Sequence, residues 1–106
     1  MRGVLLEHRG YGPRHYDLIV ARGVRCPTLR LEPGFPWRVA WAAPHRRRYL
    51  TYRGPVAGGR GVVERRWSGP VRLLRTRLCC GPGFPWGLRI VPLPRRPSCA
   101  PCMIRI

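Results

Sequence analysis

The sequence predicts a compact antiparallel β-barrel built from short strands, and three observations support this fold class. Apolar residues come in short runs rich in Val, Leu and Ile, and Gly or Pro interrupts these runs at short intervals. No stretch free of Gly and Pro keeps a helical spacing of apolar residues for three turns. The 106 residues suffice for one small domain, and Leu, Ile, Val and Phe supply enough of them for a core.

Eight segments carry the strand pattern, and turn signals separate most of them. They span residues 3–8, 15–21, 24–32, 37–42, 49–52, 61–67, 71–78 and 87–92. The dipeptide Arg22-Gly23 predicts a tight turn between the second and third segments, and Ser68-Gly69 predicts another between the sixth and seventh. Pro27 interrupts the third segment, which is therefore predicted to be an edge strand or two shorter pieces.

Two glycine-containing stretches stand out between these segments. Residues 54–61 form a glycine-rich loop whose backbone can approach a ligand closely, and Arg60 could contact a phosphate there. Composition alone favours the alternative, a wide surface turn. The string Pro-Gly-Phe-Pro-Trp occurs twice, at 33–37 and 82–86. Two copies do not make a repeat protein, so coincidence or a shared turn type is a sufficient explanation.

Arginine dominates the charge of the chain: 21 basic residues, all arginine, face four acidic residues, and the formal net charge is +17. This balance predicts a phosphate-rich partner, because the planar guanidinium grips phosphate oxygens in pairs. A GC-rich gene would also enrich Arg, Gly, Pro and Ala together, whatever the protein does. No apolar run reaches the ~18–20 residues that cross a membrane, and the N-terminus lacks the apolar core of a signal peptide. We therefore expect a cytoplasmic protein with no membrane partner.

His8, His15 and Asp17 are the first candidates for a functional site. His15 and Asp17 are two apart at the start of a predicted strand, so their side chains point to the same face. If segments 3–8 and 15–21 pair as a hairpin, His8 arrives beside them. Two imidazoles and one carboxylate form an open site for Zn, Mn or Fe, with positions left for water or substrate. Spacing alone also fits a surface histidine pair beside an unrelated aspartate.

His45 and Tyr49 flank the run Arg46-Arg47-Arg48 and form a second candidate group. A turn or a helical stretch would bring positions i and i+4 together, whereas a straight strand would hold them roughly 13 Å apart. Together with the arginines, the two side chains would then clamp a phosphate. The alternative is a solvated basic face, which such runs more often form.

Four motifs follow one another along the chain in a recognisable order. They are Leu5-Leu6-Glu7-His8, His15-Tyr16-Asp17-Leu18, His45-x-x-x-Tyr49 and Tyr52-Arg53-Gly54-Pro55-Val56-Ala57-Gly58-Gly59-Arg60-Gly61. The series resembles the 3′-phosphoesterase domain of bacterial end-joining DNA ligases of the ligase D type, and especially its short stand-alone relatives. The resemblance covers roughly residues 3–78, and the His-Tyr-Asp triplet and the glycine-rich stretch are its most specific parts.

The resemblance implies a compact β-barrel that trims the 3′ ends of DNA with the help of Mn²⁺, with Zn²⁺ or another divalent ion as the alternative. It implies that His8, His15 and Asp17 bind the metal, and that His45 and Tyr49 engage the scissile phosphate. The substrates would be DNA ends that carry a 3′-ribonucleotide or a 3′-phosphate. A DNA ligase or polymerase of the end-joining pathway would be a partner, and the protein would associate with the nucleoid.

Four arginines are expected to contact phosphate or DNA: Arg38, Arg48, Arg53 and Arg60. The family has a phosphate-binding arginine upstream of the residue that matches His45, and Arg38 is the candidate for it. Ile19 stands where the ligase-fused domains usually carry arginine, although the stand-alone relatives often have an apolar residue there.

Two other functions also fit the sequence. A non-catalytic nucleic-acid-binding module would use the arginines with Trp37, Trp41 and Trp67 to grip a strand by charge and stacking. A decayed relative of the family would keep the fold signature without the activity. Metal dependence separates the enzyme from the binding module, because only the enzyme should lose its function on chelation or in a His15→Ala variant.

Residues 1–78 are predicted to form the phosphoesterase-like core. Residues 79–106 form a divergent segment rich in Pro, Cys and Arg. Within this segment only residues 87–91 can supply a last strand. The cysteines are Cys26, Cys79, Cys80, Cys99 and Cys102. Their odd number and the missing secretory signal argue against a disulfide framework, and the adjacent pair Cys79-Cys80 chelates one ion poorly. Free thiols are expected, with a zinc site as the alternative.

Overall fold

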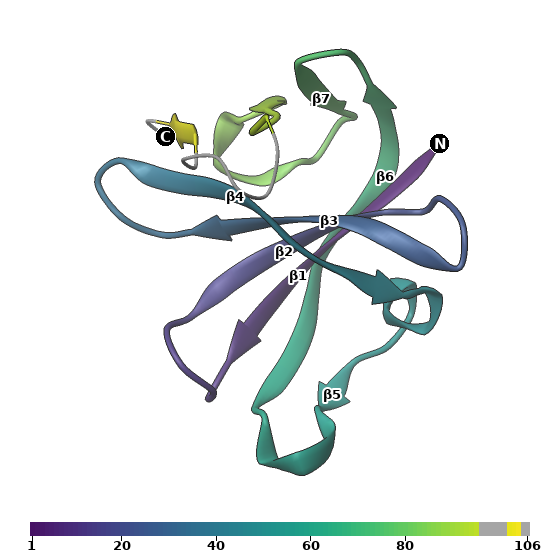
Figure 1. Cartoon of the computed structure of the whole chain (residues 1–106), viewed down its shortest axis with the longest axis vertical. Helices are drawn as coiled ribbons and strands as arrows, with labels where there is room; N and C mark the ends of the chain where they lie inside the picture. Colours follow the sequence, from purple (N-terminus) through teal and green to yellow (C-terminus); the bar gives the residue numbers. More distant parts are fainter. Residues whose placement is uncertain (96–101, 105–106) are drawn as a thin grey trace.

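A computed structural model describes residues 1–95 and the backbone of residues 102–104. In this part of the chain the strands form one antiparallel sheet in the order β8-β7-β6-β1-β2-β3-β4-β9, and β5 pairs with β6 beside this path. Their bounds are β1 Arg2–Arg9, β2 His15–Val20, β3 Arg25–Glu32, β4 Trp37–Arg46, β5 Gly54–Pro55, β6 Val62–Leu73, β7 Arg77–Cys80, β8 Ile90–Pro92 and β9 Cys102–Ile104. Strand direction turns across the sheet from β6 to β4, so the sheet curls into a half-barrel (Figure 1). The predicted fold class is confirmed in this form.

Three short 3-10 turns complete the described chain: η1 Arg47–Leu50, η2 Ala57–Gly59 and η3 Pro85–Gly87. The first two lie between β4 and β6 in the sequence: η1 follows the end of β4, and η2 follows β5 beside the start of β6 (Figure 1). Within the described residues no α-helix is present, which agrees with the frequent Gly and Pro in the sequence.

Both faces of the sheet are covered, so apolar side chains alternate between two cores. One cluster contains Leu5, Tyr16, Leu18, Val20, Leu29, Leu31, Val39, Trp67, Val71, Leu78, Cys80, Phe84 and Val91. The other contains Val4, Leu6, Ile19, Cys26 and Val63, with Tyr49, Leu50, Tyr52 and Val56 packed against it. Strand β2 is buried along its whole length because it lies between the two cores.

Strands β1 and β2 form the predicted hairpin. His8 lies opposite His15, and Leu6 lies opposite Asp17. The turn predicted at Arg22-Gly23 also joins β2 to β3, and Gly23 adopts the positive φ of 74° that such a turn requires. This register brings the histidines of two strands to one end of the sheet.

The strand predicted over residues 49–52 is wrong. Strand β4 extends to Arg46, and the chain then turns through η1, where the Tyr52 N–H donates to the Arg48 carbonyl at 3.1 Å. Tyr49 and Leu50 pack against the second core from this turn. The apolar residues at these positions therefore reflect burial of a turn and not a strand.

The turn predicted at Ser68-Gly69 is also wrong, because β6 continues through this dipeptide. Gly69 serves close packing: a Cβ atom there would lie 2.6 Å from the ring of Trp67. The chain turns later, where the N–H of Leu74 donates to the carbonyl of Arg77 at 2.9 Å. The single strand predicted over residues 71–78 is therefore wrong, because this turn separates β6 from β7. Gly69 thus makes room for an aromatic ring and does not turn the chain.

Strand β3 is neither an edge strand nor two separate pieces, because it pairs with β2 on one side and β4 on the other. The register against β4 shifts between Cys26 and Thr28, so Pro27 lies at a bulge. A bulge removes the need for the N–H that proline lacks, which explains how an interior strand tolerates it.

The segment after residue 78 packs against the same core as the strands before it. Strand β8 occupies part of the region 87–91 and pairs with β7, but the prediction that only this region can supply a last strand is wrong, because β9 pairs with β4. Phe84 and Val91 belong to the first core cluster. Cys26, Cys79 and Cys80 are free thiols, and burial raises the pKa of Cys80 to about 12. The zinc alternative depends on Cys99 and the side chain of Cys102, which lie outside the described residues.

The two Pro-Gly-Phe-Pro-Trp strings adopt different conformations, so they do not share a turn type. Phe35 is 93% exposed and precedes a cis peptide bond to Pro36, whereas Phe84 is buried and the φ of Trp86 is positive. The tryptophans of the two strings nevertheless meet, with the ring centroids of Trp37 and Trp86 4.8 Å apart. Their contact helps to fix the C-terminal segment on the sheet.

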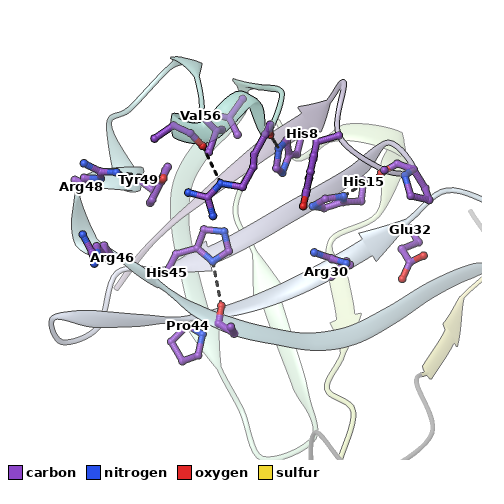
Figure 2. Close-up of a pocket in the computed structure, with 17 residues that line it drawn as sticks. His8, His15, Arg30, Glu32, Pro44, His45, Arg46, Arg48, Tyr49 and Val56 are labelled. Carbon is purple, nitrogen blue, oxygen red and sulfur yellow. Dashed lines mark hydrogen bonds between the residues drawn. The ribbon is translucent and has the colours of Figure 1, made fainter.

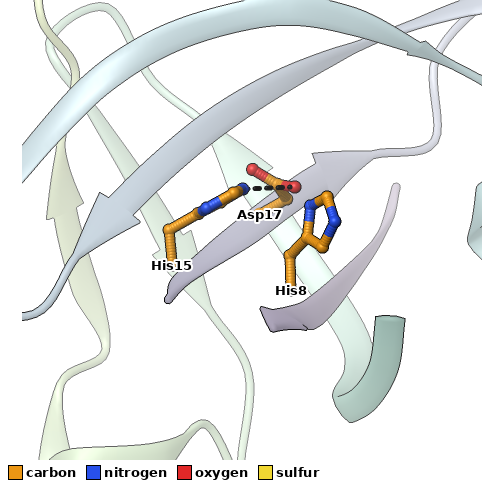
Figure 3. A group of neighbouring side chains, drawn as sticks. All are labelled: His8, His15 and Asp17. Atoms are coloured by element: carbon orange, nitrogen blue, oxygen red, sulfur yellow. Dashed lines mark ion pairs between the residues drawn. The ribbon is translucent and has the colours of Figure 1, made fainter. Parts of the chain in front are cut away.

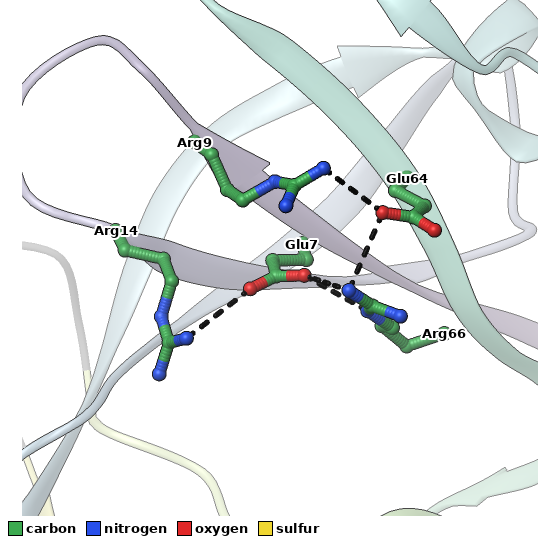
Figure 4. Close-up of polar contacts among 5 residues, drawn as sticks. All are labelled: Glu7, Arg9, Arg14, Glu64 and Arg66. Carbon is green, nitrogen blue, oxygen red and sulfur yellow. Dashed lines mark hydrogen bonds and ion pairs between the residues drawn. The ribbon is translucent and has the colours of Figure 1, made fainter.

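An ion-pair network on β1 and β6 uses two of the four carboxylates. Glu7 is almost completely buried; its carboxylate accepts a hydrogen bond from Nε of Arg66 at 2.8 Å and lies 3.5 Å from Nη1 of Arg14. Glu64 pairs with Arg9 at 3.1 Å and also approaches Arg66 (Figure 4). These contacts are structural, because a buried carboxylate needs a cation nearby.

Candidate metal centre and phosphate pocket

Three of the predicted site residues come together at the β1–β2 hairpin. His8 is near the end of β1, and His15 and Asp17 begin β2. One ligand atom from each lies within 4.8 Å of the others, and Figure 3 shows the three side chains pointing toward one another. His15 and Asp17 are buried, while His8 is partly exposed. The site is thus closed on the sheet side and open toward His8.

Backbone carbonyl groups orient both imidazole rings. Nδ1 of His15 lies 3.2 Å from the carbonyl oxygen of Pro13, and Nε2 of His8 lies 2.6 Å from the carbonyl oxygen of Arg60. A ring nitrogen that donates to a carbonyl carries the proton, which leaves the lone pair on the other nitrogen. This arrangement leaves Nε2 of His15 and Nδ1 of His8 as candidate metal ligands.

Asp17 connects the hairpin to the second candidate group. Its Oδ2 atom lies 3.4 Å from Nε2 of His15 and 3.4 Å from Nε2 of His45. Burial opposes ionisation of Asp17, but the contacts with His15 and His45 outweigh it and hold the pKa of the carboxyl well below its usual range. The same carboxylate raises the pKa of His15, against the opposing effect of burial.

The donor set fits a divalent metal ion. Nε2 of His15 and Oδ1 of Asp17 are buried and have no hydrogen-bond partner among the described residues. Buried polar atoms are normally paired, so two unpaired ones at a single point suggest a missing partner. Two nitrogens and a carboxylate suit Zn²⁺, Mn²⁺ or Fe²⁺, and three protein ligands leave open positions.

A pocket of about 680 Å³ opens beside His8 and His15. Its lining includes the basic residues His8, His15, Arg30, His45, Arg46, Arg48 and Arg60. Figure 2 shows His45 in the middle of the pocket, between His15 on one side and Tyr49 on the other. A wall of this composition suits an anion, because guanidinium groups bind phosphate oxygens bidentately.

The turn η1 brings His45 and Tyr49 together, as a turn was expected to do. Their ring centroids are 5.6 Å apart in an edge arrangement. The guanidinium of Arg48 lies over the Tyr49 ring, 5.1 Å from its centroid. Nδ1 of His45 lies 3.1 Å from the Ala43 carbonyl oxygen, so its Nε2 faces Asp17.

Two of the four arginines expected to bind phosphate line the pocket, and the other two do not. Arg48 and Arg60 line the pocket, whereas Arg38 and Arg53 are exposed and do not belong to its described lining. Arg38 is on β4 opposite Glu32, and Arg53 follows η1.

Among the polar and charged lining residues, sequence analysis missed Tyr11, Arg30 and Glu32. Arg30 lies directly opposite Asp17 in the β2–β3 register, which places both on the same sheet face. Pairing the predicted hairpin of segments 15–21 and 24–32 would have revealed this position.

The tryptophans of the binding-module alternative do not offer free stacking surfaces. Trp67 is buried in the first core cluster, and Trp37 and Trp41 pack against the same cluster. The indole N–H of Trp41 donates to the Pro94 carbonyl at 2.7 Å, and that of Trp67 donates to Pro82 at 3.0 Å. These side chains hold the fold together, so a stacking function would have to use other aromatic residues.

No protein-family model matches the chain, and comparisons with curated proteins and with solved structures also found no match. A functional proposal therefore depends on the geometry of the site and on the motifs of the sequence. Among the described residues there is no helix with the length and apolar character needed to span a bilayer.

Proposed function

We propose that the protein is a metal-dependent phosphoesterase that trims the 3′ ends of DNA, removing a terminal ribonucleoside or a 3′-phosphate. The observation that carries the proposal is the cluster of His8, His15 and Asp17, of which the two histidines line a pocket together with arginines. The resemblance of the motifs to the 3′-phosphoesterase domain of end-joining ligases supports the choice of substrate. Mn²⁺ is the proposed ion, with Zn²⁺ as the alternative.

Each part of the pocket has a role in this reaction. A bound divalent ion supplies positive charge that polarises a phosphoryl oxygen. Arg30 and Arg60 bind and orient the scissile phosphate, and they offset the negative charge that develops on it, while Arg48 binds the adjoining phosphate of the strand. Tyr49 positions Arg48 above its ring, and its hydroxyl group can donate a proton to a phosphate oxygen.

His45 is the proposed general acid. Hydrolysis adds the oxygen of water to phosphorus and breaks the P–O bond to the leaving group, whose oxygen then takes up a proton. His45 lines the pocket, and its Nδ1 faces the Ala43 carbonyl oxygen. Its Nε2, 3.4 Å from Oδ2 of Asp17, is therefore the nitrogen that can give a proton to the leaving oxygen. Asp17 would thus serve the metal site and also hold the imidazole of His45 in place.

The test measures release of phosphate and nucleoside from primer–templates that end in a 3′-phosphate or a single 3′-ribonucleotide, with Mn²⁺ or with a chelator. Wild type is compared with His15→Ala and Asp17→Asn. Glu64→Gln is the matched control, because it also removes one carboxylate charge but lies in the ion-pair network on β1 and β6. Turnover that needs Mn²⁺ and is lost in both site variants, but not in the control, supports the proposal. A folded wild type without metal-dependent turnover refutes it.

A non-catalytic nucleic-acid-binding module is the second candidate. It is favoured by the exposed arginines around the pocket and by the aromatic side chain of Tyr11, which is exposed at the pocket rim. Such a module would bind DNA equally well with a chelator present, and His15→Ala would leave its affinity unchanged. The same set of variants therefore separates the two candidates.

A further inference from the structure

The charge of the pocket is asymmetric along its length. Arg46 and Arg48 lie on one side of His45, whereas Glu32 lies on the other side, next to Arg30 (Figure 2). The strands produce this order, because Glu32 ends β3 beside the β3–β4 turn and Arg46 ends β4 far from it. A ligand that lies along the pocket therefore meets the guanidinium groups of Arg46 and Arg48 at one end, and a carboxylate beside the single guanidinium of Arg30 at the other.

Glu32 is the carboxylate that no cation neutralises in the described residues. Glu7 and Glu64 form ion pairs with arginines, and Asp17 lies between two histidines. Arg38 is directly opposite Glu32 in the β3–β4 register, yet the two form no ion pair. With 21 arginines in the chain, an unpaired carboxylate is unexpected, and this one faces the pocket. It is therefore available to a ligand.

The chemistry of a carboxylate limits what it can hold. It accepts hydrogen bonds from hydroxyl and amino groups, and it repels phosphate. Internal nucleosides of a polynucleotide carry a phosphate on both sides, but the 3′-terminal nucleoside carries one on its 5′ side only. The terminal nucleoside is therefore the part of the strand that suits the Glu32 end, while the charged chain suits the arginine end.

We infer that Glu32 receives the terminal nucleoside of the substrate, and that Arg46 and Arg48 hold the phosphates of the strand behind it. The inference rests on the proposed function, since it assumes that the scissile phosphate lies over His8, His15 and His45. Glu32 accepts hydrogen bonds from the 2′- and 3′-hydroxyls of the terminal ribose. Its charge excludes a nucleoside that bears a further 3′-phosphate, so the site acts on chain ends.

The test measures equilibrium binding in the presence of a chelator, so that no turnover occurs. Two fluorescent oligodeoxynucleotides of equal length are compared, one ending in a ribonucleotide and the other in a 2′,3′-dideoxynucleotide. They carry the same number of phosphates and differ in the terminal hydroxyl groups alone. Wild type is measured beside Glu32→Ala and the matched control Glu64→Ala, which removes the same side chain from a position outside the pocket.

Wild type should bind the ribonucleotide end about tenfold more tightly, because two hydroxyl groups donate to one charged acceptor. Glu32→Ala should abolish this preference while binding the dideoxy oligonucleotide at least as tightly as wild type, which also shows that the variant folds. Glu64→Ala should keep the preference. A wild type without the preference, or a Glu32→Ala variant that retains it, overturns the inference.

A second measurement separates this inference from the proposed function. Products are identified by mass for an oligonucleotide that ends in a 3′-phosphorylated ribonucleotide, with Mn²⁺ present. Wild type should remove the terminal phosphate first, whereas Glu32→Arg should also release an intact nucleoside 3′-phosphate. A protein that shows the binding preference but no turnover refutes the phosphoesterase proposal and leaves Glu32 as a terminal-nucleoside site. Turnover with no change of product in Glu32→Arg refutes the exclusion of phosphate by Glu32.

Discussion

The carbonyl oxygen of Arg60 lies 2.6 Å from Nε2 of His8, so the glycine-rich loop orients a candidate metal ligand on a different strand. The loop is held in turn by a hydrogen bond from the Val56 N–H to the Gly61 carbonyl at 2.8 Å. Gly61 has a φ of +81°, and a Cβ atom at this position would overlap the carbonyl oxygen of Arg9. The loop and the end of β1 therefore depend on this one glycine.

Gly61→Ala should weaken both folding and metal binding. The backbone at this position has a positive φ, which is unfavourable for a residue with a Cβ atom, and the added methyl group also forces the loop away from β1, so we expect a loss of about 3 kcal/mol in the free energy of unfolding. Mn²⁺ affinity should fall because His8 loses the carbonyl that orients it. Gly23→Ala is the matched control, since Gly23 also has a positive φ but nothing lies within 4 Å of its added Cβ. Gly23→Ala should lower the free energy of unfolding by about 1 kcal/mol and leave Mn²⁺ affinity unchanged. Equal Mn²⁺ affinities in the two variants would contradict this account.

The Glu7 ion pairs should contribute more to stability than those of Glu64. Glu7 is 3% exposed and contacts both Arg66 and Arg14, whereas the side chain of Glu64 is 44% exposed. Glu7→Gln should lower the free energy of unfolding by about 1–3 kcal/mol, since it replaces charge-assisted hydrogen bonds with weaker ones. Glu64→Gln should change it by less than about 1 kcal/mol. Urea denaturation of the two variants measures the difference, and an equal loss in both would show that burial of Glu7 does not strengthen its ion pairs.

Much of the candidate metal site could be predicted because its residues are local in sequence. His15 and Asp17 share a face by strand alternation, and His8 follows from the pairing of two adjacent segments. The strand alternation and the tight turn at Arg22-Gly23 could also be predicted, because they too depend on residues close in the sequence. Short-range geometry of this kind needs no knowledge of the rest of the fold.

The other parts of the site depend on longer-range packing, which the sequence does not display. Arg30 enters the pocket through the β2–β3 register, while Arg38 lies further along the sheet and remains outside. The missed turn at η1 arises because Tyr49 and Leu50 are buried against residues distant in the sequence. The false turn at Gly69 has a different cause, because that glycine packs against the ring of Trp67 two residues earlier. Composition cannot distinguish a glycine that turns the chain from one that makes room for Trp67.

Arg30 should contribute more to phosphate binding than Arg38. Arg30 lines the pocket opposite Asp17, whereas Arg38 lies outside the lining. Binding of a single-stranded oligodeoxynucleotide with a 3′-phosphate is measured over a range of salt concentrations. Arg30→Gln should lower the slope of log K against log[salt] by roughly 0.7, the value for one phosphate contact on single-stranded DNA. Arg38→Gln removes the same charge and should leave the slope closer to wild type. A larger effect of Arg38→Gln would contradict this expectation and support Arg38 as the phosphate-binding arginine, as the sequence predicts.

Stability of the metal-free protein should fall as pH rises from 6 to 8, and metal should reverse this trend. The pKa of His15 is raised in the folded state above its ordinary value of about 6.5, because protonated His15 contacts Asp17. A raised pKa contributes stability that is fully present below about pH 6.5 and is lost as pH rises through the folded pKa. The lowered pKa of Asp17 contributes stability above about pH 4 that is lost only in stronger acid.

Chemical denaturation at several pH values, with a chelator or with Mn²⁺, measures both effects. In the metal-free protein His15→Gln should flatten the decline between pH 6 and 8, while Glu64→Gln should retain it. With Mn²⁺ the stabilisation should grow over the same interval, because a metal ion binds the neutral imidazole and competes with its proton. Stabilisation by Mn²⁺ that is independent of pH, or equal in wild type and His15→Gln, would place the ion away from His15.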